Sequence, residues 1–242
     1  MSNCNHILSG PPPLTLPVFD PQTQRITRGG RADILCGILD AKRVAVKAFR
    51  RLDQNLDQLL GVIRGLAHIH SQSIVHGDLK ALNILVAGDG QVTRICDFGT
   101  STIECECFNP PETPPDGTPQ WDSPELWMGG GEPEGELDEQ AIQRTQSSDV
   151  WAFGCVALEV QMGMMPWDPF HEGDLRKMQR RQLDAEAGPP ANEEHLELGE
   201  HEIKQWVWGL MTRCWNAAPL QRPTAAELLN DCEVKAMDLA AA

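Results

Sequence analysis

The stretch that decides the fold is HGDLKALN at residues 76–83, followed by DFG at residues 97–99. Between the two motifs stand two short apolar runs rich in β-branched residues, Ile84–Val86 and Val92–Cys96, joined by a glycine-containing segment. This pattern favours a tight β-hairpin. A hairpin returns the chain to the edge where it started, so we predict that the aspartates of the two motifs lie side by side.

These acids, next to a lysine and an amide, are the groups that phosphoryl transfer requires. The reaction needs a carboxylate to accept the hydroxyl proton, a cation on the transferring phosphoryl group and oxygen ligands for Mg²⁺. Asp78 would supply the carboxylate and Lys80 the cation. Asn83 and Asp97 would hold the metal. We therefore predict that Asp78 and Lys80 are catalytic and that Asn83 and Asp97 are metal ligands.

This constellation resembles the catalytic loop and the metal-binding motif of eukaryotic protein kinases. Further motifs resemble those of the family and follow in its order: VAVK at 44–47, SPE at 123–125, SDVWAFG at 148–154 and QRP at 221–223. The resemblance covers about residues 25–231. It implies ATP and Mg²⁺ as cofactors and a protein as the substrate.

The resemblance also assigns roles to residues outside the central motifs. It implies that Lys47 holds the α- and β-phosphates of ATP and that Asp149 hydrogen-bonds the backbone of the catalytic loop. It implies further that Arg222 pairs with Glu125. We expect the second half of the chain to be organised around these contacts.

Two features of the resemblance indicate which type of residue is phosphorylated and which branch of the family the chain resembles. Lys80 and Thr118 resemble Ser/Thr kinases, in which the lysine meets the γ-phosphate and the threonine braces the base. Cys214-Trp215 and Arg222-Pro223-Thr224 resemble the tyrosine-kinase-like branch. We therefore expect Ser/Thr specificity within that branch.

The N-terminal part departs from the family pattern in its phosphate-binding loop. Only Gly29 and Gly30 stand where a glycine-rich loop is expected. Glycine matters there because backbone N–H groups must approach the phosphates closely. We assign Gly29 and Gly30, together with Lys47, to ATP binding.

A second departure is the short interval after Lys47. Only Ala48–Gln54 separate this lysine from the helix predicted to begin at Asn55. In the family this interval supplies a helix with the glutamate that holds the lysine, two strands and the hinge that binds adenine. We therefore predict weak or absent turnover. Two alternatives stay open: a catalytically dead pseudokinase that acts as a binding module, and an incompletely assembled gene product of an ordinary kinase.

Two further departures concern control. Gly77 stands where the family commonly has an arginine, so a phosphate on Ser101, Thr102 or Thr113 would lack that guanidinium partner. We predict less dependence on phosphorylation of this loop. The acidic, glycine-rich segment Met128–Gln146 is interpreted as a solvated insertion, with a docking site as the alternative.

The patterns along the chain predict an α+β, protein-kinase-like fold. A small truncated antiparallel β N-lobe would span residues 25–50, with strands near Asp33–Leu39 and Arg43–Phe49. A mainly helical C-lobe would span residues 51–231. Before and after these lobes we predict a flexible, proline-rich arm at 1–24 and a C-terminal tail at 232–242.

Apolar periodicity predicts the helices of the C-lobe. They are a helix with one apolar stripe at Asn55–His70, a helix apolar on nearly every face at Val150–Met162, an amphipathic helix near residues 203–214, and a last helix opened by a capping box at Thr224–Glu227. We expect Ser147, Ser148 or Asp149 to cap the second of these.

Composition limits the partners and the compartment. The 242 residues contain 20 Lys and Arg against 35 Asp and Glu, a formal charge of −15, which argues against nucleic acid or an anionic membrane surface as a partner. No apolar stretch approaches the about 18 residues of a membrane span, and the first residues lack an export signal. The eight cysteines form no metal-binding pattern. We expect an intracellular, cytoplasmic protein.

Overall fold

The computed structural model describes the greater part of the C-lobe and the backbone of the N-terminal strands. Described are residues 25–28, 32–39, 42–49, 56–87, 92–104, 117–128, 143–168, 188–196, 198 and 201–241, with side chains only from residue 56 onward. The strands and helices are β1 (Arg25–Arg28), β2 (Ala32–Leu39), β3 (Lys42–Phe49), α1 (Asp57–Ser71), β4 (Ile74–Val75), β5 (Ile84–Ala87), β6 (Val92–Ile95), β7 (Thr102–Ile103), α2 (Glu125–Met128), α3 (Gln146–Ala157), α6 (Glu202–Cys214) and α7 (Ala225–Ala241).

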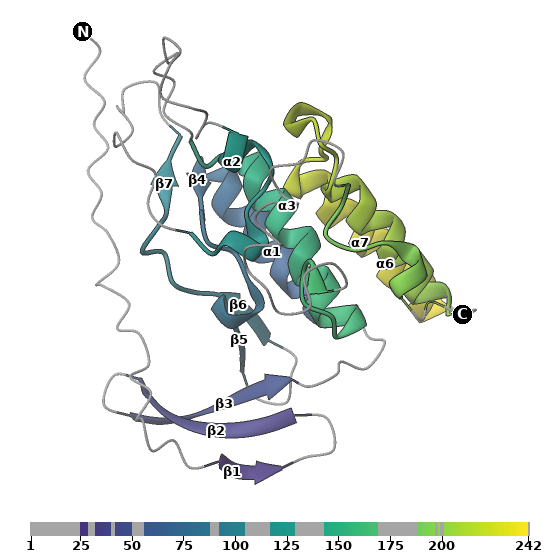
Figure 1. Ribbon diagram of the computed structural model, residues 1–242. Helices are drawn as coiled ribbons and strands as arrows, with labels where there is room; N and C mark the ends of the chain where they lie inside the picture. Colours follow the sequence, from purple (N-terminus) through teal and green to yellow (C-terminus); the bar gives the residue numbers. More distant parts are fainter. Residues whose placement is uncertain are drawn as a thin grey trace, which may run out of the picture.

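The arrangement of these elements has two parts. Figure 1 shows the sheet β1–β3 at one end of the molecule and the helices α1, α3, α6 and α7 packed together at the other. The short hairpin β5–β6 lies between them, next to β3. The structure therefore has the predicted α+β organisation, with a small β part and a mainly helical part.

The N-terminal strands form one antiparallel sheet in the order β1-β2-β3. β2 and β3 pair along their whole lengths, from Ala32 opposite Phe49 to Leu39 opposite Lys42. Such full pairing of two strands with two intervening residues confirms the meander expected from the apolar runs. The turn residues themselves lie outside the described part of the chain.

The three residues assigned to ATP binding all fall in this region. Lys47 lies in β3, where its backbone is opposite Ile34, and its side chain is outside the described part of the chain. Gly29 and Gly30 are outside the described residues altogether. Their assignment remains a prediction.

Helix α1 confirms the helix predicted near Asn55–His70. Its buried side chains form one stripe: Leu59, Leu60, Val62, Ile63, Leu66 and Ile69. The helix contacts both β6 and α7. Burying an aliphatic side chain of this size contributes about 1.5–3 kcal/mol, so these side chains stabilise the packing of the helix on the common core.

The predicted hairpin after the first motif is also present. A 3₁₀ turn at Ala81–Asn83 leads directly into β5, and β5 pairs antiparallel with β6 from Ile84 opposite Ile95 to Ala87 opposite Val92. The hairpin thus brings the chain back beside the turn from which it left.

Helix α3 is buried on nearly every face, as its composition indicates. The prediction that Ser147, Ser148 or Asp149 caps it was wrong, because the N-cap is Thr145. The Thr145 side chain accepts a hydrogen bond from the Ser148 backbone N at 3.2 Å, and the Ser148 hydroxyl accepts one from the Thr145 N at 3.0 Å. Ser148 therefore acts as the third residue of the helix in a capping box.

Beyond Ala157 the helix continues as a wider π-helical turn. This turn spans Leu158–Met162 and ends at Gly163, which has a left-handed φ of 67°. A glycine adopts that conformation without steric cost and so suits a helix end. The predicted extent to Met162 is therefore correct, with a change of helical type that apolar periodicity does not show.

The two C-terminal helices complete the core. α6 confirms the predicted amphipathic helix, and the capping box of α7 is formed by Thr224 and Glu227, whose carboxylate accepts from the Thr224 backbone N at 2.8 Å. α7 runs on to Ala241, so the boundary predicted after Asp231 falls within a helix. Cys232, just past that boundary, is buried in the common core.

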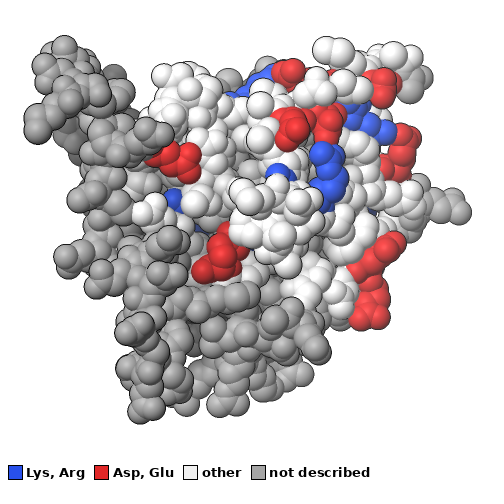
Figure 2. Space-filling view, turned by 90° about the horizontal axis from the view of Figure 1, so that it is seen from above, with Lys and Arg blue, Asp and Glu red and all other residues white. Residues whose placement is uncertain are grey.

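The surface of the described part carries charges of both signs. Figure 2 shows acidic and basic side chains interspersed on the face that is seen from above. None of the helices in the described part of the chain has the length and apolar character needed to cross a lipid bilayer.

Candidate active site

Residues 76–83, which we call the catalytic loop, place Asp78 at the centre of a compact polar network. Lys80 Nζ donates hydrogen bonds to Asp78 Oδ2 and to Thr118 Oγ1, both at 2.6 Å. Thr118 Oγ1 in turn donates to Asp78 Oδ1 at 2.6 Å. Both carboxylate oxygens are thus held in a fixed direction, while the Asp78 side chain keeps 12% of its surface exposed. A carboxylate that is oriented and still accessible can accept a proton from a bound hydroxyl.

Asn83 is buried beside the same carboxylate. Its Nδ2 donates to the backbone O of Asp78 at 2.8 Å and to Asp78 Oδ2 at 3.3 Å. Because the amide nitrogen makes both bonds, the amide oxygen of Asn83 is the atom left to accept or to bind a cation. The role of Asn83 as a metal ligand stays a prediction, and its amide oxygen is the atom that this role requires.

Asp97 is fixed beside the catalytic loop by its neighbours in the sequence. Cys96 N donates to Asn83 O at 2.9 Å, and His76 Nε2 donates to Cys96 O at 3.0 Å. Ser101, four residues after Asp97, donates from its hydroxyl to His76 O at 2.9 Å. The turn that carries Asp97 is therefore tied to both ends of the catalytic loop, which is the juxtaposition that the hairpin predicts.

The backbone and the side chain of Asp97 both differ from those of an ordinary loop residue. Its φ of 66° lies in the left-handed region, which residues other than glycine rarely adopt. From the described residues its carboxylate accepts one long hydrogen bond, from Gly99 N at 3.4 Å. Strained backbone that holds an available carboxylate is a common feature of functional sites.

The oxygen atoms here suit Mg²⁺. The amide oxygen of Asn83 and the carboxylate of Asp97 are hard ligands of the type that this ion prefers. A site with two protein oxygens leaves further positions for phosphate oxygens and water. The donor set of these two residues therefore fits the predicted metal.

The backbone of the catalytic loop is anchored from helix α3. Asp149 is only 2% exposed and accepts from His76 N at 2.7 Å and from Gly77 N at 2.9 Å. His70 Nε2 lies 3.0 Å from the same carboxylate. These contacts confirm the role expected for Asp149, and they explain why it does not cap its own helix.

A second anchor joins the SPE motif to the C-terminal part. Arg222 Nη1 and Nη2 donate to the two oxygens of Glu125 at 2.6 and 2.7 Å. Arg222 also donates to Ser147 O at 3.0 Å and lies over the ring of Trp151, with 5.1 Å between Cζ and the centroid. The expected Arg222–Glu125 pair is therefore present, and its guanidinium also contacts helix α3.

Glu159 is a site residue that the sequence reasoning missed. Its Oε1 accepts from Trp121 Nε1 at 2.6 Å and from Ala81 N at 3.3 Å, so it connects the π-helical turn after α3, the catalytic loop and the segment before SPE. Burial raises the pKa of Glu159 to about 7, because desolvation outweighs these two hydrogen bonds. Its partners are 38 and 78 positions away in the sequence, and no local pattern identifies them.

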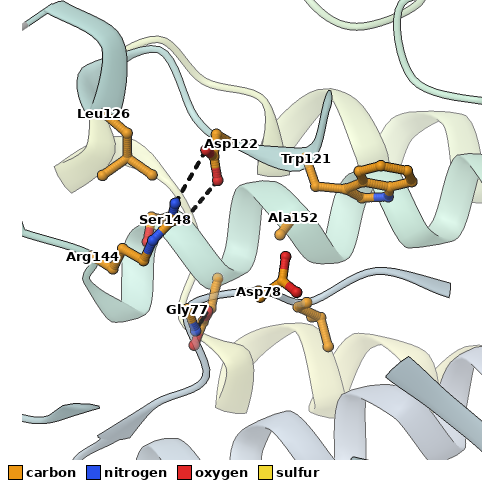
Figure 3. A pocket seen from close by; sticks show the side chains of 10 residues that line it. Gly77, Asp78, Trp121, Asp122, Leu126, Arg144, Ser148 and Ala152 are labelled. Atoms are coloured by element: carbon orange, nitrogen blue, oxygen red, sulfur yellow. Dashed lines mark hydrogen bonds and ion pairs between the residues drawn. The ribbon is translucent and has the colours of Figure 1, made fainter. Parts of the chain in front are cut away.

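A second missed feature is the ion pair of Arg144 with Asp122. The pair is part of the lining of a small, open pocket, to which Asp78, Trp121 and Asp149 also belong. Figure 3 shows Arg144 directed at Asp122, with Gly77 and Asp78 on the neighbouring backbone. The pocket lies on the side of Asp78 that faces α3, and its lining does not include the predicted metal ligands.

Lys80 and Thr118 hold the carboxylate of Asp78, and a hairpin joins the loop that carries Asp78 and Asn83 to the turn that carries Asp97. These are the types of group that phosphoryl transfer requires. The chain belongs to the protein kinase family, since the protein kinase domain model matches residues 40–232. The match includes the catalytic loop and the elements that anchor it.

Several curated kinases are similar to the chain. They include the serine/threonine-protein kinase BCK1/SLK1/SSP31 of Saccharomyces cerevisiae, 29% identical over 187 residues. They also include the MAP kinase kinase kinase mkh1 of Schizosaccharomyces pombe, 31% identical over 170 residues, and the MAP kinase kinase skh1/pek1 of the same organism, 35% identical over 136 residues. These matches cover 76%, 70% and 55% of this chain, but only 11%, 14% and 33% of the three relatives.

Proposed function

We propose that the chain transfers the γ-phosphoryl group of ATP to serine or threonine hydroxyls of a protein. The observation that carries the proposal is the network on Asp78, in which a lysine and a threonine hold the carboxylate in one direction. The Ser/Thr preference is supported by Lys80 and Thr118, and by relatives whose names describe them as serine/threonine-protein kinases.

Each residue has a defined task in this proposal. Asp78 orients the substrate hydroxyl and accepts its proton, while Lys80 neutralises charge that develops on the transferring group. Asn83 and Asp97 would hold Mg²⁺, which neutralises and aligns phosphate oxygens. In the N-terminal part, Lys47, Gly29 and Gly30 would bind the triphosphate.

Turnover should be slow, because β3 is followed almost at once by α1. Phe49 ends the strand and Asp57 begins the helix, so seven positions stand between them. The missing stretch would otherwise supply the adenine-binding hinge and the glutamate partner of Lys47. The same observation favours a second candidate function, that of a pseudokinase that binds a protein partner without catalysis.

The compartment proposed for this activity is the cytoplasm. Four cysteines of the described part, Cys96, Cys155, Cys214 and Cys232, are free thiols. Burial raises the pKa of the Cys96 thiol to about 11 and keeps it protonated. Reduced, unreactive thiols suit a compartment with a high concentration of glutathione and of ATP.

Two measurements on the wild type and on Asp97→Asn test the proposal. They are the thermal stabilisation by Mg²⁺·ATP and the transfer of phosphate to a general Ser/Thr substrate. We expect stabilisation and slow transfer by the wild type, and loss of both in the variant, because the amide is a far weaker Mg²⁺ ligand. Absence of both effects in the wild type would overturn the proposal. Stabilisation without transfer would support the pseudokinase.

A further inference from the structure

The ion pair of Arg144 with Asp122 joins two segments that meet at the catalytic loop. Arg144 Nη1 donates to Asp122 Oδ1 at 2.6 Å and Nη2 donates to Oδ2 at 3.1 Å. The two side chains are only 9% and 11% exposed. A bidentate pair at this depth has a fixed geometry, unlike an exposed salt bridge. Figure 3 shows both bonds beside Gly77.

The Arg144 side chain occupies space that two glycines leave open. A Cβ atom on Gly117 would lie 1.9 Å from Arg144 Nη2 and 2.4 Å from its Cζ. A Cβ atom on Gly77, whose φ is +80°, would lie 3.2 Å from Arg144 Cδ and 2.7 Å from Thr100 O. The guanidinium therefore packs directly on the backbone of Gly117, and the stem of the side chain packs on the catalytic loop.

The residue after Gly117 is the threonine that holds Asp78. Thr118 Oγ1 donates to Asp78 Oδ1 at 2.6 Å. Arg144 thus contacts the chain immediately before Thr118, at Gly117, and four residues after it, at Asp122. A shift of residues 117–122 would break the bond from Thr118 to the base.

The charges around Asp122 give Arg144 a second effect. Burial raises the pKa of Asp122, and the nearby Asp78 carboxylate raises it further, whereas the hydrogen bonds and charge of Arg144 lower it. Lys80 lowers it slightly. Without Arg144 the negative charges of Asp78 and Asp122 would repel one another in a poorly solvated place. Residues 117–122 would then tend to move away from Asp78.

We propose that Arg144 is a positioning residue, which clamps residues 117–122 against the catalytic loop so that the Thr118 hydroxyl stays on Asp78. The inference rests on the proposed kinase function of Asp78. It also accounts for a glycine at position 77, where the family commonly has an arginine. In this chain the cation next to residue 77 is Arg144, which comes from the segment before α3. Because the clamp is an ion pair within the chain, it requires no phosphate.

The test compares Arg144→Gln and Arg144→Lys with the wild type. We expect Arg144→Gln to lower kcat by about 10-fold to 100-fold, because small displacements of catalytic groups have effects of this size. The KM for ATP should stay unchanged, since the contacts of Arg144 described above, with Asp122, Gly117 and Gly77, involve none of the residues assigned to ATP or Mg²⁺. Hydrogen exchange should become faster at residues 117–122. Arg144→Lys, which keeps the charge but not the bidentate geometry, should restore part of the kcat and part of the protection from exchange.

The control Arg64→Gln removes an exposed cation, which is paired with Glu233 at 3.0 Å. It should change neither kcat nor the exchange at residues 117–122.

The outcomes separate the inference from the proposed function. If the wild type transfers no phosphate, the kinase proposal fails and hydrogen exchange alone decides about the clamp. Unchanged exchange at residues 117–122 in Arg144→Gln would overturn the inference, as would a kcat equal to that of the wild type. Should Arg144→Gln fail to fold, Asp122→Asn removes the same pair without leaving an unpaired carboxylate, and the same two results apply to it.

Discussion

Arg222 illustrates how one buried charge holds distant parts of the chain together. Its side chain has no exposed surface and pairs with Glu125, which is 28% exposed. We expect Arg222→Ala to lower the free energy of unfolding by about 2–4 kcal/mol, because it removes a buried pair and leaves the Ser147 carbonyl without its donor. Urea unfolding followed by tryptophan fluorescence measures this change.

The matched control for this prediction is Arg213→Ala. Arg213 also pairs with a carboxylate, Asp231, at 2.6 Å, but the two side chains are 51% and 34% exposed. Its loss should cost less than about 1 kcal/mol. Equal costs for the two arginines would contradict the view that burial gives Arg222 its importance.

Glu159 should make stability depend on pH near neutrality. Its pKa is raised from 4.5 to about 7 in the folded protein, so the folded state favours the protonated form. The stabilising contribution of the proton is complete below about pH 4.5 and is lost as the pH rises through 7. Glu159→Gln, which keeps an acceptor for Trp121, should equal the wild type at pH 4.5. It should be more stable at pH 8 by up to about 3 kcal/mol.

The measurement is a series of urea unfolding curves for both proteins between pH 4.5 and pH 8. Parallel pH profiles for the wild type and the glutamine variant would show that Glu159 ionises normally. Steeper loss of stability in the wild type above pH 6 is the expected result.

For individual residues of the site, the sequence predicts those that belong to linear motifs. It misses those whose place in the site depends on tertiary contacts. Asp78 and Asn83 precede a hairpin and Asp97 follows it, and that spacing is enough to bring the two segments of backbone that carry them together. Arg144 and Glu159 have no such signal, because their partners come from other elements and the sequence does not show which elements meet.

Among the helices, the contact of α3 with α6 depends on a glycine. A Cβ atom on Gly154 would lie 2.7 Å from Trp215 Nε1 and 2.8 Å from Cys214 Cβ. We expect Gly154→Ala to lower the free energy of unfolding by about 1–3 kcal/mol, because neither neighbour can move without disturbing the core. Thermal unfolding of the variant measures the effect.

Gly209 in α6 is the matched control, because an added Cβ would meet nothing within 4 Å. Gly209→Ala should raise stability by about 0.5–1 kcal/mol, since alanine favours the helix interior. Destabilisation by both substitutions would contradict the close approach of α3 and α6 at Gly154.

Element prediction succeeded where one local pattern decides the outcome. The apolar stripe of α1 and the capping box of α7 are such patterns, and both are present. The start of α3 was predicted wrongly because four of the five residues from Thr145 to Asp149 are of types that can cap a helix. The Asp149 carboxylate accepts hydrogen bonds from the catalytic loop instead, and Thr145 is the cap.

For the whole molecule, the order of motifs predicted a small β part followed by a larger helical part. The β part and the helical part contact one another where β3 lies beside β5. The sequence shows the short connection from β3 to α1 as a departure from the family. Its effect on ATP binding depends on side chains of the N-terminal part, which motif spacing does not predict.

The most direct test of the account is the transfer of phosphate from ATP to a general Ser/Thr protein substrate by the wild type and by Asp78→Asn. Asparagine preserves the shape of the side chain but cannot accept the hydroxyl proton. We expect a rate lower by about 10²-fold to 10⁴-fold in the variant. The thermal shift with Mg²⁺·ATP should be unchanged. Equal rates in the two proteins would contradict the assignment of Asp78 as the base.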